Sequence, residues 1–191
     1  VDEVGGPSVK PPQPDGLWHA VGYSGSNTVR FKQDTGDKTY RRSLYTFWKR
    51  TSAPPQMAIM DAPSREACTV RRERTNSAMQ ALLLMNEQQY FEAARRLAER
   101  AMKEANPTPS EKVAFMFVTA AARPPGDADA TDLLGDFAFY QSAFKQAPEE
   151  AKKAINVGDT KPDASLDPTD LAAWTMVANT ILNLDEVVTK N

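Results

Sequence analysis

The sequence predicts an all-α protein, an irregular helical bundle with a long, extended and mostly loop N-terminal arm. Two observations carry this prediction. Beyond residue 76, apolar residues recur at helical spacing in one segment after another, and Pro or Gly separates the segments. Before residue 40 the chain has little periodicity and many helix breakers, as in GGPSVKPPQPDG and DTGD. We place the arm at residues 1–39, packed on the bundle, and the helical domain at residues 40–191.

Large apolar residues anchor the arm at intervals. Leu17 and Trp18 form an expected anchor pair, and the alternating segment 28–33, TVRFKQ, predicts a short strand. Extended chain of this kind is stable only against other parts of a fold, because its backbone N–H and C=O groups need partners.

The segment 40–50 predicts the first helix. Tyr40, Leu44, Phe47 and Trp48 recur at i, i+4, i+7 and i+8, which is the spacing of one helical face. The prolines in Ala53–Pro55 end this helix. Its aromatic face is either core or a platform for stacking sugars, and core is the commoner role of such a stripe.

Further helices follow from residue 77 onward. A long one begins at Asn76 or Ser77, with a kink or a break near Asn86, and Met79, Leu82 and Leu83 open its apolar face. The segment 110–122 is apolar nearly all round and is expected at the centre of the bundle. Three more helices are predicted. The first covers residues 131–144, with an apolar stripe of Leu133, Phe137, Tyr140 and Phe144, and the second covers residues 148–156, with Pro148 in its first turn. The third covers residues 167–188 with Asp167 as its N-cap, and its Asn179 and Asn183 lie either on a polar face or at a ligand.

Charge is distributed unevenly along the chain. The formal net charge is −2, so a nucleic-acid partner is not expected. Residues 29–76 nevertheless carry 11 Lys and Arg against 5 Asp and Glu, whereas the rest carries 12 against 20. A basic segment therefore accompanies an acidic helical body, either in mutual satisfaction within one fold or as a site for an external anion.

The stretch Asp61–Asn76, DAPSREACTVRRERTN, concentrates the arginines. Guanidinium groups suit carboxylates, sulfates and backbone carbonyls, so two interpretations stand. In the first, which we favour, these side chains clamp loop carbonyls and acidic helices inside the fold. In the second, they bind an acidic or sulfated glycan. The candidate ligand-binding residues are Arg65, Arg71, Arg72, Arg74 and Asn76, beside Tyr45 or Trp48.

The sequence contains no catalytic motif that we can identify. It lacks a nucleophile motif, a Walker loop, a dinucleotide fingerprint and HExxH, so we expect no catalytic residues and no metal site. The adjacent carboxylates at residues 149–150 and 185–186 are expected on solvated helix faces, and the acidic loop at residues 127–132 lacks the EF-hand pattern. One cysteine and one histidine argue against a disulfide, a zinc ribbon or haem attachment in this segment. Cys68 is predicted to be a buried, inert thiol.

The longest apolar run near the middle of the chain, residues 81–85, is too short to span a bilayer. No secretory signal opens the sequence, which begins at Val1. We therefore expect an excised or processed piece of a longer protein, and the missing signal says nothing about where that protein resides.

Three long stretches resemble a known family. YRRSLYTFWKRTSAPPQMAIMDAPSREACTVRRERTNSAMQALLLMNEQQYFEAARRLAER, GGPSVKPPQPDGLW and DPTDLAAWTMVANTILNLDE are similar to the planctomycete-type C-terminal domain of unknown function, which closes large multi-domain proteins. The resemblance covers nearly the whole chain. SAMQ stands here where TPLQ is common, and MNEQQ where a segment like LNDPQ is usual. Losing that proline makes a continuous helix through Asn86 more plausible.

The resemblance implies a particular setting for the chain. Members typically follow a second domain of unknown function, often with a cytochrome c-like domain ahead, so haem would be carried upstream and not in this segment. The parents look exported, which implies a periplasmic or otherwise extracytoplasmic location, and they are linked with polysaccharide breakdown. No catalytic residues carry over. Two functions follow as hypotheses: a non-catalytic module whose partners are the upstream domains of the same protein, or a domain that binds or acts on a polysaccharide.

Overall fold

The computed structural model describes residues 3–71 and 75–189, and it divides into two compact units. The N-terminal unit is Val1–Leu83 and the C-terminal unit is Leu84–Asn191. The sequence placed a boundary after residue 39, whereas the structure divides after Leu83. Whether the arm packs on the bundle stays a prediction.

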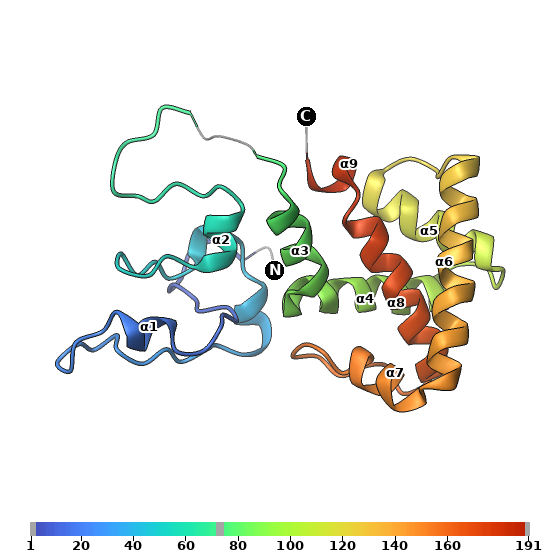
Figure 1. Ribbon diagram of the computed structural model, residues 1–191, viewed down its shortest axis with the longest axis horizontal. Helices are drawn as coiled ribbons and strands as arrows, with labels where there is room; N and C mark the ends of the chain where they lie inside the picture. Colours follow the sequence, from blue (N-terminus) through green and yellow to red (C-terminus); the bar gives the residue numbers. More distant parts are fainter. Residues whose placement is uncertain (1–2, 72–74, 190–191) are drawn as a thin grey trace. The chain divides into compact units, whose positions relative to one another are not determined.

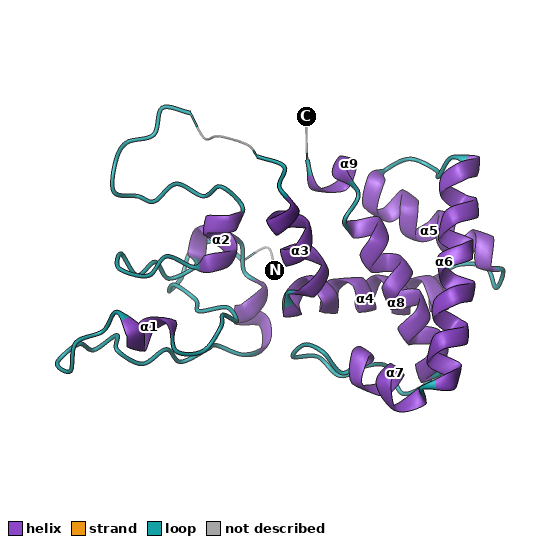
Figure 2. Ribbon diagram, viewed as in Figure 1, coloured by secondary structure: helices purple, strands orange, loops and turns teal. Residues whose placement is uncertain are grey.

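The all-α prediction is confirmed, because the regular elements of the described residues are helices joined by loops (Figure 2). Helices α1 to α3 come first, with two short 3₁₀ helices, η1 and η2, between α1 and α2, and α4 to α9 belong to the C-terminal unit (Figure 1). The bounds are α1 Leu17–Ala20, η1 Gly36–Tyr40, η2 Ser43–Tyr45, α2 Pro55–Ile59, α3 Ala78–Asn86, α4 Gln88–Glu104, α5 Pro109–Ala121, α6 Asp127–Gln146, α7 Pro148–Ile155, α8 Pro168–Leu182 and α9 Asp185–Val188.

The N-terminal unit has a small aromatic core around Trp18. The Trp18 ring is buried and contacts Phe31 edge-on at 5.0 Å between centroids, and Phe47 at 5.4 Å. Of the predicted anchor pair, Trp18 is buried and Leu17 half-buried. These three rings fix only a small part of the unit, so most of its loops need other interactions to keep one conformation.

Side-chain donors supply that order by binding backbone carbonyls of the loops. Buried Arg41 donates to the carbonyls of Pro7, at 3.1 Å, and of two earlier residues, Glu3 and Gly5. Buried Lys49 donates to the carbonyls of Trp18 at 3.3 Å and Thr28 at 2.9 Å. Each donor fixes irregular chain whose carbonyls have no helical partner.

The predicted helix over residues 40–50 is wrong. Only the 3₁₀ turn η2 forms there, and the following chain runs beside Val9. The Val9 N–H donates to the Tyr45 carbonyl at 2.8 Å, and the Phe47 N–H donates to the Val9 carbonyl at 2.7 Å. These bonds between distant segments replace helical ones, and Leu44 is left 75% exposed. The predicted strand at residues 28–33 is also wrong, because no ladder partner pairs with it among the described residues.

Helix α8 forms the centre of the C-terminal unit. It packs against α4, α6 and α7, and nine of its residues are buried. Trp174 of α8 stacks on Phe137 of α6 with 3.9 Å between ring centroids. The expectation that residues 110–122 are central is wrong, because α5 buries only Val113, Met116 and Phe117. The apolar composition of α5 on all sides had predicted the central position for that helix. The small side chains of α8 instead let three helices approach α8 closely.

The predicted long helices are interrupted at two points. Glu87 separates α3 from α4, and its carboxylate caps α4 by accepting from the N–H groups of Gln89, at 2.8 Å, and Tyr90. The break, not the continuous helix, is therefore what forms near Asn86. The segment 167–188 divides into α8 and α9, and Asp167 caps α8 as predicted.

Two further predictions, the apolar face of α3 and the polar face of α8, differ from the structure. Met79 and Leu82 of α3 are exposed by more than half, so they do not form a buried stripe. Asn179 lies on no polar face. Its side chain is buried and donates to the Met85 carbonyl at 3.1 Å, so α8 holds the end of α3.

A buried ion network joins α4 to the loop at residues 157–163. The Arg95 guanidinium, fully buried, contacts Glu99 and donates to the carbonyl and hydroxyl of Thr160, both at 2.8 Å. Glu92 accepts from the N–H groups of Asp159 at 2.9 Å and Thr160 at 3.0 Å. Gly158 has φ +107°, and a Cβ there would collide with the Glu92 carboxylate, so the loop requires glycine at this point.

Replacing Arg95 tests the importance of this network. Arg95→Ala leaves Glu92 and Glu99 buried with too little positive charge, so we expect a loss of about 3–5 kcal/mol in unfolding free energy. Arg96→Ala is the matched control, since Arg96 also contacts Glu99 but its side chain is 58% exposed, and it should cost less than about 1 kcal/mol. Urea unfolding followed by far-UV circular dichroism measures both. Equal losses would show that burial does not set the contribution of Arg95.

Candidate functional site

The described part of the arginine stretch, residues 61–71 and 75–76, is mostly exposed, and Asp61 at its start is hydrogen-bonded to Thr75 near its end. The Asp61 carboxylate accepts from the N–H of Thr75 at 2.8 Å and from its hydroxyl, also at 2.8 Å. Gln80 donates to the same carboxylate at 3.1 Å and to the Ile59 carbonyl at 3.0 Å. We call Asp61, Thr75 and Gln80 the latch, and the chain between its two ends the arginine loop.

Two of the four arginines in this loop are described. Arg65 is exposed and its guanidinium lies over the Trp48 ring, 4.6 Å from the centroid. Arg71 is exposed as well. Arg72 and Arg74 lie outside the described residues. The structure thus brings together one predicted pair, Arg65 and Trp48.

The internal-clamp interpretation does not describe Arg65 and Arg71. Neither binds a carbonyl or a carboxylate among the described residues, and both side chains face solvent. Clamping arginines exist, but they are Arg41 and Arg95. The prediction for Cys68 is wrong too, because the thiol is exposed. Both outcomes have the same reason: the described residues 63–71 lie on the surface, with no apolar core around them in which to bury side chains.

The other candidate residues have different neighbours. The Tyr45 ring is covered by the Arg41 guanidinium at 3.9 Å, and its hydroxyl accepts from the Gly5 N–H at 2.8 Å. Tyr45 is therefore part of the clamped N-terminal chain. Asn76 is exposed, directly after Thr75 of the latch.

The exposed cations of the N-terminal unit differ from those of the C-terminal unit in their pairing. Within the described residues of the N-terminal unit, six exposed cations form no ion pair, side-chain hydrogen bond or ring contact: Arg30, Lys32, Lys38, Arg42, Arg50 and Arg71. In the C-terminal unit seven cations have carboxylate partners: Arg95, Arg96, Arg100, Lys103, Arg123, Lys152 and Lys153. The basic composition of residues 29–76 signals the first set, but only the structure shows that its members are unpaired.

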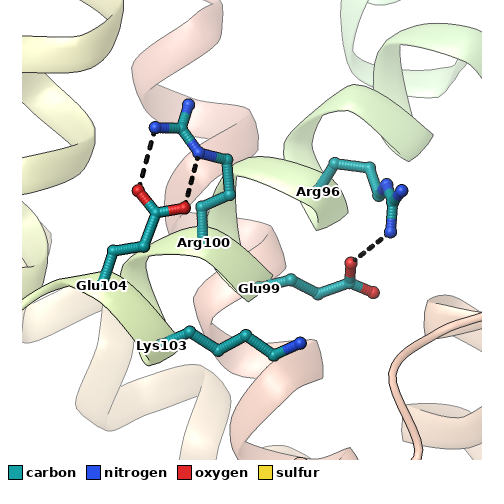
Figure 3. A pocket seen from close by; sticks show the side chains of 5 residues that line it. All are labelled: Arg96, Glu99, Arg100, Lys103 and Glu104. Atoms are coloured by element: carbon teal, nitrogen blue, oxygen red, sulfur yellow. Dashed lines mark hydrogen bonds and ion pairs between the residues drawn. The ribbon is translucent and has the colours of Figure 1, made fainter.

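A shallow hollow of about 280 Å³ on α4 illustrates paired charge (Figure 3). Arg100 binds Glu104 through two hydrogen bonds, of 3.1 and 3.0 Å, and Arg96 binds Glu99 at 2.9 Å. The Arg100 guanidinium holds the pKa of the Glu104 carboxyl below its ordinary value. Because these charges satisfy one another along a single helix, the hollow offers little to an external ion.

Three carboxylates of the adjacent pairs singled out in the sequence are also engaged. Glu149 and Glu150 pair with Lys152 and Lys153 along α7, at 2.9 and 2.7 Å. Glu186 binds Arg123 at 2.6 Å. The described residues contain no group of three or more His, Cys, Asp or Glu placed to hold a metal ion. In the same residues, no helix combines the length and the apolar character needed to cross a bilayer.

Comparison with known proteins identifies the family of this chain but assigns it no activity. Residues 1–135 match the family described as "Protein of unknown function (DUF1553)". The chain belongs to this family. The match includes the N-terminal unit, the arginine loop and the helices through the first part of α6. No curated protein and no solved structure matches the chain.

The latch can be tested through the loop that it holds. Asp61→Ala removes the acceptor of Thr75 and Gln80, so we expect trypsin to cleave after Arg65 and Arg71 several-fold faster. Asp61→Asn keeps one acceptor oxygen and should give an intermediate rate. Asp37→Ala, which removes an exposed carboxylate of η1 outside the loop, is the matched control and should leave the rate unchanged. Mass spectrometry of a digestion time course measures all of them, and equal rates for the three variants would contradict the latch.

Proposed function

We propose that this domain of unknown function is a non-catalytic structural and interaction module of an exported multi-domain protein. Its N-terminal unit would present a cationic surface to an acidic partner, and its C-terminal unit would serve as a rigid helical base. The partner is an upstream domain of the same protein. The family resemblance supports the setting: a periplasmic or otherwise extracytoplasmic parent, with haem in a cytochrome c-type domain upstream and a link to polysaccharide breakdown.

The unpaired cations of the N-terminal unit carry this proposal. Six exposed lysines and arginines have no ion pair, side-chain hydrogen bond or ring contact, so the fold does not offset their charge, whereas seven cations of the C-terminal unit have carboxylate partners. A surface of this kind favours association with an acidic surface, because each contact relieves repulsion and steers the encounter.

A second candidate function is binding of an acidic or sulfated glycan by the arginine loop. Arg65 stacked on Trp48 supports it, since a guanidinium over an indole ring presents fixed donors to a sulfate or carboxylate. The indole N–H of Trp48 is buried and has no hydrogen-bond partner among the described residues, so a glycan would reach it only if the surrounding side chains moved.

Charge reversal tests the first proposal. We expect the chain to bind the separately produced preceding domain of its parent protein, with an affinity that falls at least tenfold between about 0.05 and 0.5 M salt. Arg42→Glu with Arg50→Glu should weaken binding at low salt by a further factor of about ten. The control is Lys152→Glu with Lys161→Glu, which changes net charge equally but lies in the C-terminal unit. Biolayer interferometry measures the affinities, and no binding, or equal losses in both variants, would contradict the proposal.

The glycan function has its own probe. Chondroitin sulfate should bind in a salt-sensitive manner while neutral dextran does not, and Arg65→Gln with Arg71→Gln should abolish the difference. Isothermal titration calorimetry at low salt measures this binding. Failure of chondroitin sulfate to bind would remove the second function and leave the first untouched.

A further inference from the structure

Between residues 135 and 143 of α6, about two and a half turns, the exposed residues are all uncharged, and the one charged residue of this span, Asp136, is half-buried. We call Gly135, Ala138, Phe139, Ser142 and Ala143 the outer face of α6; all five are exposed and they recur at helical spacing. The opposite side of the same helix packs inward through Leu133, Phe137 and Phe144. Exposed sides of α4 and α7 are instead covered by ion pairs. The outer face of α6 therefore differs from the exposed sides of α4 and α7.

Gly135 has no explanation within the chain. It lies in the middle of a 20-residue helix, where glycine is less favourable than alanine, and its φ is not in the left-handed region. A Cβ added there would meet nothing within 4 Å. Neither backbone conformation nor internal packing requires glycine at this position. What the missing side chain does provide is a dent that allows another surface to approach the helix backbone.

Phe139 lies one turn further along and protrudes from the same face. Its side chain is 68% exposed, and its ring contacts Tyr140 edge-on at 5.3 Å between centroids. A large ring beside a dent on one helix face is self-complementary when the second helix runs in the opposite direction. The ring of one copy then lies opposite the Gly135 of the other, and the reverse contact forms by symmetry.

Charges at the two ends of α6 favour the same antiparallel direction. Asp127 and Asp132 lie toward its beginning and Lys145 toward its end, and none of the three has an ion-pair partner among the described residues. The helix dipole accounts for Asp127 and Lys145, but Asp132 lies beyond the first turn. An antiparallel pair places the acidic end of each α6 beside the basic end of the other, whereas a parallel pair places like charges together.

We propose that the outer face of α6 binds a second copy of this chain, in a two-fold symmetric dimer with antiparallel α6 helices. The contact consists of Phe139 in the dent at Gly135, small side chains between the helices, and Lys145 beside the acidic end of the partner helix. One helix pair buries little area, so the dimer is weak, with a dissociation constant in the micromolar to millimolar range. This inference is independent of the function proposed for the N-terminal unit.

Sedimentation equilibrium of the full chain over a wide concentration range tests the proposal. We expect a concentration-dependent dimer, and Phe139→Glu should make the chain monomeric. Gly135→Gln separates loss of the dimer contact from loss of protein stability. It should raise the midpoint of thermal unfolding, because glutamine favours the helix, and it should weaken dimerisation at least tenfold. Val118→Glu is the matched control, since Val118 is an exposed apolar residue of α5, 48% exposed, and should leave the dimer intact.

A charge exchange completes the test. Lys145→Glu should weaken the dimer, and combining it with Asp127→Lys and Asp132→Lys should restore it. A monomer at every concentration would overturn the proposal. So would a dimer that survives both Phe139→Glu and Gly135→Gln, because another surface would then hold the copies together.

Discussion

The fold depends on buried side-chain donors that satisfy the carbonyls of irregular chain. Arg95 is the clearest example, because one guanidinium binds a glutamate of its own helix and the loop that leads from α7 to α8. Arg41 and Lys49 perform the same task where helices are few and short. Without such donors, these carbonyls would be removed from water without partners, at a cost comparable to a lost hydrogen bond. Order in the loops therefore rests on a few charged side chains and not on apolar burial alone.

The two units use their charges for different purposes. In the C-terminal unit, seven cations pair with carboxylates of the same or other elements, whereas the exposed residues of α6 between positions 135 and 143 are uncharged. In the N-terminal unit the buried cations Arg41 and Lys49 bind loop carbonyls, and six exposed cations form no ion pair, side-chain hydrogen bond or ring contact. Net charge near zero for the whole chain hides this contrast. The family to which the chain belongs is described as one of unknown function, so membership carries no activity with it.

Local signals predicted the C-terminal helices well and the N-terminal unit poorly. Asp167 before Pro168 marks the start of α8, and the stripe of Leu133 and Phe137 marks α6, because a helix satisfies its own backbone and needs only one apolar face. The same rule failed at Tyr40–Arg50, where hydrogen bonds to Val9 override the helical spacing. Bonds between residues more than 30 positions apart leave no periodic pattern in the sequence.

For the candidate site too, local sequence signals predicted some features and tertiary contacts decided the others. The sequence by itself determined the helical class, the starts of α7 and α8, and the uneven distribution of charge, since each follows from local propensity or composition. The tertiary structure decided which arginines are clamps, because Arg41 and Arg95 are buried beside carbonyls whereas Arg65 and Arg71 face solvent. It also decided that Cys68 is exposed and that α8, not α5, is central. The physical reason is that burial depends on which distant segments meet, and no local pattern encodes that meeting.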